Sequence, residues 1–154
     1  MKLALALLLV ASTAVADPAG GEPMRKIMCR TEGPTTVEVK VVQLGSEPAG
    51  HVTKLFEGNG WTIADIDKSG KADKEEHGCL GPSDLRELQA KLDKAKWKIT
   101  TARNHCMAMA TTSTEYTVKG KVVWTERMCS GQTLDKNSAD AIDAVKAAVA
   151  KLKP

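Results

Sequence analysis

The chain of 154 residues lacks a charge bias: 22 lysines and arginines stand against 19 aspartates and glutamates, a formal net charge of +3. Such a balance gives no electrostatic reason to bind nucleic acid or an anionic membrane. Long apolar runs are absent after residue 16, and no later stretch approaches the roughly 20 apolar residues of a membrane-spanning helix. We therefore expect no nucleic-acid partner and no membrane span in the mature chain.

A recognisable catalytic constellation is also missing. Ser130 in "CSGQ" lacks the strand-turn-helix setting of an activated nucleophile, and no histidine lies where it would activate one. Adjacent carboxylates such as Glu75 and Glu76 are too common to indicate acid-base catalysis. We expect no enzymatic activity and no cofactor.

The amino terminus has the features of a secretory signal peptide. Lys2 precedes the apolar run "LALALLLVASTAVA", which ends in small residues before Asp17. Residues 17–24, "DPAGGEPM", are rich in proline and glycine and predict a mobile leader. The sequence thus predicts a signal peptide over residues 1–16, a leader over 17–24 and a single domain over 25–154, exported to a periplasm or the extracellular space.

All four cysteines lie beyond the predicted signal peptide. An oxidising compartment favours disulfides over free thiols, so two bridges are expected. Four cysteines allow three connectivities, and the choice depends on the topology. They are Cys29, Cys79, Cys106 and Cys129.

Hydrophobic periodicity in the first half predicts strands followed by a helix. Alternating valines in residues 35–44 indicate a half-buried strand. Gly58-Asn59-Gly60 is a strong reversal motif between two β-like runs, because asparagine and glycine tolerate positive φ. The stretch "PSDLRELQAKLDKA" places three leucines on one helical stripe, with Pro82 and Asp84 suited to the first turn. These leucines are Leu85, Leu88 and Leu92.

The second half predicts a hairpin and a closing helix. A two-residue turn at Lys119-Gly120 would set Val118 opposite Lys121 and Tyr116 opposite Val123. In the last segment Asp135 or Ser138 could cap a helix with a stripe formed by Ile142, Val145, Val149 and Leu152. The expected core face of the hairpin comprises Met107, Met109, Val122, Trp124 and Met128.

This order predicts an α+β fold: an antiparallel sheet of about four to five strands with two helices packed on one face. If each helix doubles back across the sheet, Cys29 and Cys79 lie at the same end of the domain. We therefore favour the pairs Cys29–Cys79 and Cys106–Cys129, the second of which requires a bulge.

The stretch "DIDKSGKADKEE", residues 65–76, has the ligand spacing of an EF-hand calcium loop, with Gly70 at its sharp turn. The flanking segments are not helices, and interleaved lysines partly cancel the acidic charge. An exposed polar connection between a hairpin and a helix is the favoured interpretation, and calcium binding is the alternative. The calcium ligands would be Asp65, Asp67, Ser69, Asp73 and Glu76.

Three tryptophans supply most of the aromatic content. Trp61, beside Gly60 at the hairpin tip, is the candidate for an exposed anchor that binds a protein partner. Packing in the core or across a hairpin is the expected role of Trp97 and Trp124. The lysine-rich run "KLDKAKWK", residues 91–98, is interpreted as a solvated helical face.

The strand pair, "GCLGPSDLRELQAKLDKAKW", "TEYTVKGKVVWTERMC" and the closing helix resemble the layout of the emfourin family, over residues 35–152. Emfourins are small bacterial inhibitors of thermolysin-like metalloproteases. The chain is also similar to unassigned secreted bacterial proteins with the same "GCL" pattern. The glycine-rich "SGGF"-like stretch of the family is absent, so no inhibitory residue carries over. The sequence thus predicts a small secreted or periplasmic, disulfide-stabilised binding protein that acts through loops such as 57–61 and 65–78. The resemblance implies that this binding protein is a protease inhibitor.

Overall fold

A computed structural model of the chain describes residues 29–43, 49–101, 111–128 and 130–152. The predicted signal peptide and leader lie outside these ranges. So do both members of the Cys106–Cys129 pair and the predicted core residues Met107 and Met109.

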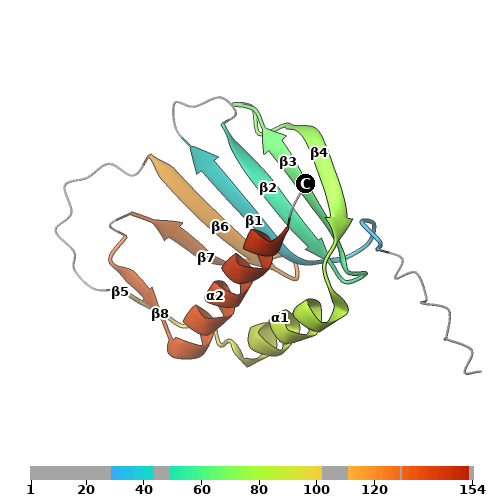
Figure 1. Cartoon of the computed structure of the whole chain (residues 1–154). Coiled ribbons are helices and arrows are strands. Elements are labelled where there is room, and N and C mark those ends of the chain that lie inside the picture. The colour runs from blue at the N-terminus through green and yellow to red at the C-terminus, as the bar shows by residue number, and fades with distance from the viewer. Residues whose placement is uncertain (1–28, 44–48, 102–110, 129, 153–154) are drawn as a thin grey trace, which may run out of the picture.

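Six strands form one antiparallel sheet (Figure 1): β1 (Thr35–Gln43), β2 (Gly50–Phe56), β3 (Gly60–Ile66), β4 (Ala72–Cys79), β6 (Thr112–Val118) and β7 (Lys121–Arg127). Their order across the sheet is β4-β3-β2-β1-β6-β7. The short strands β5 (Ile99–Thr101) and β8 (Gln132–Leu134) form a second sheet. The α+β class is confirmed, but the expected number of four to five strands is too low.

The extra strand of the large sheet is β4, which pairs with β3 at the sheet edge. Its sequence, "ADKEEHGC", has polar or charged side chains on both faces, and nearly all of them are exposed. A strand without an apolar face has no alternating pattern, so periodicity alone does not reveal it. The prediction that residues 65–76 lead from a hairpin into a helix is therefore wrong, because they form a hairpin themselves.

The two helices are α1 (Pro82–Lys94) and α2 (Lys136–Lys151). Pro82 lies in the first turn of α1, and the predicted leucine stripe is buried. Asp135 caps α2 by accepting a hydrogen bond from the backbone N–H of Ser138, which confirms the first of the two predicted caps. The buried residues of α2 are Ser138, Ala141, Ile142, Val145 and Ala148.

Both helices cover the same face of the large sheet (Figure 1). On β1 that face carries Val37 and Val39; Val37 lies opposite Leu55 of β2 and Val118 of β6. These side chains form a single cluster with the leucines of α1 and the apolar stripe of α2. The predicted arrangement of two helices on one sheet face is therefore correct.

A bulge in the β6–β7 hairpin changes the predicted core. The structure pairs Val118 with Lys121, as expected, but it pairs Tyr116 with Trp124 because the register shifts at Val123. The extra residue sets Trp124 opposite the buried Tyr116 and leaves Val122, opposite Thr117, on the other face, where Val122 is 58% exposed. Met128 is 63% exposed, so placing Val122 and Met128 in the core was wrong, whereas Trp124 is buried as predicted.

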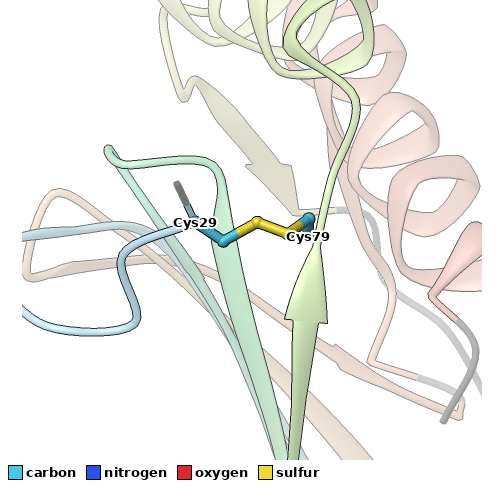
Figure 2. Close-up of a disulfide and its surroundings, with 2 residues drawn as sticks. All are labelled: Cys29 and Cys79. Atoms are coloured by element: carbon cyan, nitrogen blue, oxygen red, sulfur yellow. A yellow bond between two sulfur atoms is a disulfide. The ribbon is translucent and has the colours of Figure 1, made fainter. Parts of the chain in front are cut away.

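The Cys29–Cys79 disulfide is present, which confirms the favoured pair (Figure 2). The two Cα atoms lie 5.4 Å apart. The bond ties the start of the described chain to the end of β4, and the N–H of Arg30 donates to the carbonyl of Gly58 at 3.0 Å. The segment 29–31 is thereby held against the β2–β3 turn.

Candidate functional site

The predicted calcium frame is the turn of the β3–β4 hairpin. The Asp67 carboxylate accepts from the N–H of Ser69 at 2.8 Å, from the Ser69 hydroxyl at 2.6 Å and from the N–H of Lys71 at 2.9 Å. These hydrogen bonds, the Ser69 hydroxyl first among them, hold the pKa of Asp67 below its usual value. The carboxylate therefore stabilises the turn from within.

The other predicted calcium ligands are spread along the two strands. Asp65 lies opposite Asp73, and Glu76 lies opposite Ile63. Lys74, with a φ of 48°, forms a bulge between Asp73 and the rest of β4. Within the described ranges, no three histidine, cysteine, aspartate or glutamate side chains are grouped so that they could hold a metal ion.

We expect the melting temperature of the protein to be the same in millimolar calcium and in chelator. The reason is that the Asp67 carboxylate, one of the predicted calcium ligands, already accepts three hydrogen bonds from groups within its own turn. A thermal melt followed by circular dichroism measures this. A calcium-dependent rise that disappears in Asp65→Asn/Asp73→Asn would establish the site instead.

Trp61 is buried, with 3% of its surface exposed, so its prediction as an exposed anchor is wrong. It lies on β3 opposite Leu55 and Gly78, on the face that the helices cover. A Cβ on Gly78 would lie 2.5 Å from Cζ2 of the indole ring, so the ring lies directly over this glycine. The neighbouring turn is covered too, because Gly60 faces the backbone of Arg30. Gly60 and Trp61 are therefore covered, whereas Glu57 at the other end of the predicted loop is exposed.

A hollow that the sequence did not indicate lies between the end of α1 and the β6–β7 turn. Its volume is about 340 Å³. Its apolar lining comes from the buried Leu92 and Val118 and the half-buried Trp97 and Val123, and charged side chains form the rest. We call this hollow the Trp97 groove, and it is lined by Leu92, Asp93, Trp97, Val118, Lys119, Lys121 and Val123.

The start of α2 holds the backbone at Trp97 in an unusual conformation. Trp97 has a φ of 52°, in a region that bulky side chains rarely adopt. Its N–H donates to the Ser138 hydroxyl oxygen at 2.8 Å, and the N–H of Lys98 donates to the Asp135 carboxylate at 3.1 Å. The residues that cap α2 thus also fix the segment that carries Trp97. Local strain of this kind, about 1–3 kcal/mol per residue, is typical of functional sites.

Two lysine-rich segments meet at the Trp97 groove. They are residues 91–98, at and after the end of α1, and residues 118–121 of the β6–β7 turn. Nζ of Lys119 lies 3.4 Å from the Asp93 carboxylate, which joins the two segments. The sequence gives no sign of this site because the two segments are far apart in the chain, and each one alone has the pattern of a solvated surface.

A second hollow, of about 430 Å³, lies on the sheet face away from the helices. Val52, Ala64 and Ile66 form part of its lining, and its charged side chains are Glu38, Lys40, Lys54 and Glu75. The opposite charges balance, and one face of an antiparallel sheet ordinarily contacts water. The Trp97 groove is therefore the stronger candidate site.

Comparison with known proteins adds no relative. No family model, curated protein or solved structure matches this chain, so its resemblance to the emfourins stays a prediction from layout. In the part of the chain that the structure describes, no helix is both long and apolar enough to cross a membrane.

Proposed function

We propose that the chain is an exported, disulfide-stabilised binding protein that binds a protein partner at the Trp97 groove. The observation that carries this proposal is a hollow, lined by apolar and charged side chains, that contains a tryptophan whose strained backbone is fixed by the cap of α2. Binding sites are typically concave and apolar with a few polar groups at defined positions. Tryptophan is also among the residues that contribute most to binding energy at protein interfaces.

The partner class that we propose is a secreted protease, which makes the chain an inhibitor. The layout resemblance to emfourins supports this class, as does the Cys29–Cys79 bond in a small domain. A braced scaffold loses little conformational entropy on binding, and this favours affinity. The calcium alternative lacks a grouped set of ligands among the described residues, and the melt above tests it.

Inhibition assays test the proposal. The mature chain is titrated into thermolysin-like metalloproteases and, for comparison, into serine proteases. We expect near-stoichiometric loss of activity for at least one thermolysin-like enzyme. Trp97→Ala is expected to weaken this inhibition roughly tenfold or more, as the loss of an interface tryptophan typically does.

Val122→Ala is the matched control for Trp97→Ala. Val122 is an exposed apolar residue of β7 that does not line the Trp97 groove, so its loss should leave inhibition unchanged. The absence of inhibition across the panel, with the chain still folded and intact, would overturn the assignment as an inhibitor.

A further inference from the structure

We propose that the partner of the Trp97 groove is an acidic polypeptide segment that inserts one apolar side chain into the hollow. This inference rests on the proposed function, because it names the chemistry that the same groove recognises.

The first argument is the charge around the groove. The two segments that meet there contain six lysines and a single acid, Asp93, and all six lysines are exposed. The whole chain has a formal net charge of only +3, so the remainder of the molecule is net acidic. The two segments therefore carry a formal charge of +5 and the rest of the chain one of −2, so positive charge is concentrated in these segments. The lysines are Lys91, Lys94, Lys96, Lys98, Lys119 and Lys121.

Such a separation favours partners with clustered negative charge. Acidic groups are attracted to the lysines during diffusional approach, and like-charged basic partners are repelled. Asp93 neutralises only part of this field, because it is the single acid of the two segments and its ion pair with Lys119 joins two mostly exposed side chains. Lys121, which lines the groove, and the exposed lysines of residues 91–98 can contact a partner's carboxylates.

The second argument is the shape of the apolar surface. Trp97, Val118 and Val123 line a hollow, so a partner must supply a protruding apolar side chain to fill it. Its volume of about 340 Å³ is near the lower end of the range for ligand pockets. Insertion into an anionic membrane would instead require apolar side chains that project from the protein. A sulfated or phosphorylated polyanion would contact the lysines without filling the hollow.

Fluorescence anisotropy with labelled peptides tests the proposal on the full mature chain. The first peptide set has three acidic residues on each side of a central phenylalanine, leucine or methionine. The second set keeps the acidic flanks around a central serine, and the third keeps the apolar centre between serine and asparagine flanks. We expect the first set to bind roughly tenfold tighter than either of the others. Its affinity should fall as NaCl rises from about 0.01 M to 0.15 M, over which the screening length shortens from about 30 Å to 8 Å.

Charge reversal locates the binding surface. Lys119→Glu/Lys121→Glu is expected to weaken binding of the first set by roughly tenfold or more, and Trp97→Ala should do the same. Lys71→Glu/Lys74→Glu is the matched control, since it makes an equal charge change on two exposed lysines of the β3–β4 hairpin, at the opposite sheet edge. This control should retain binding within about twofold. Melting temperatures of all variants establish that each one is folded.

Several outcomes would overturn the inference. One is that the peptides with neutral flanks bind as tightly as the acidic peptides. Another is that the folded chain does not bind the acidic peptides at all. Tighter binding of heparin or of anionic phosphatidylglycerol vesicles, sensitive to Lys119→Glu/Lys121→Glu but not to Trp97→Ala, would identify a polyanion or membrane surface instead. Protease inhibition that survives the lysine reversal would leave the proposed function standing and reject the acidic partner. Acidic-peptide binding without inhibition of any protease would support the acidic partner and reject the assignment as an inhibitor.

Discussion

Replacing Trp61 by alanine is expected to lower the free energy of unfolding by roughly 3–5 kcal/mol. The side chain is 3% exposed and belongs to the cluster between the sheet and the two helices. The variant removes a large apolar surface from the core and leaves a cavity that the neighbouring residues fill only in part. Because Gly78 offers no side chain beneath the ring, its backbone cannot close that space. Urea denaturation followed by circular dichroism measures the change.

The same variant distinguishes a core residue from a binding anchor. Replacing an exposed anchor would weaken binding while the stability of the protein stays nearly constant, whereas replacing a core residue lowers that stability first. Val122→Ala serves as the control, because the removal of a largely exposed valine should change the free energy of unfolding by no more than about 0.5 kcal/mol. A loss below about 1 kcal/mol for Trp61→Ala, together with weaker binding, would restore the anchor role.

Removing the Cys29–Cys79 bond with the variant Cys29→Ala/Cys79→Ala is expected to lower the free energy of unfolding by about 4 kcal/mol. The bond closes a loop over a sequence separation of 50, and without it the unfolded chain gains the conformational freedom that the closed loop denies. For a domain of this size the melting temperature should fall by roughly 10–20 °C. A thermal melt followed by circular dichroism measures this loss.

A second readout of the same variant separates effects on the unfolded and folded states. An unfolded chain without the cross-link is more expanded and exposes more surface, so the urea m value should rise. A large loss of stability with an unchanged m value would indicate damage to the packing around segment 29–31 instead. An unchanged melting temperature would mean that the bond contributes nothing to the stability of the fold.

The elements with strong local patterns could be predicted from sequence. The leucine stripe and Pro82 locate α1, and Asp135 marks the start of α2. Both predicted turns are present because their backbone demands positive φ, which Asn59 and Gly120 adopt at 63° and 77°. Once the helices were expected to double back across the sheet, the Cys29–Cys79 pair followed from their geometry.

The rest depended on contacts between distant parts of the chain. An edge strand such as β4 needs pairing on one side only, so it carries no apolar face that periodicity can detect. A bulge of one residue at Val123 puts Val122 and Trp124 on opposite faces, whereas strict alternation would put them on the same face. The roles of two tryptophans did not follow from their positions in the chain. Trp61, beside the β2–β3 turn, is buried, and Trp97, in a lysine-rich run, lines a groove.

The disulfide also has a consequence for how the protein matures. Cys29 and Cys79 are the first two cysteines in the chain, with no other cysteine between them. A chain exported amino terminus first would present this pair before Cys106 emerges from the translocation channel. An oxidase that joins thiols in their order of arrival would then form the native bond directly, without the exchange steps that correct a mispaired disulfide. Maturation of this part of the fold would require an oxidant but not an isomerase.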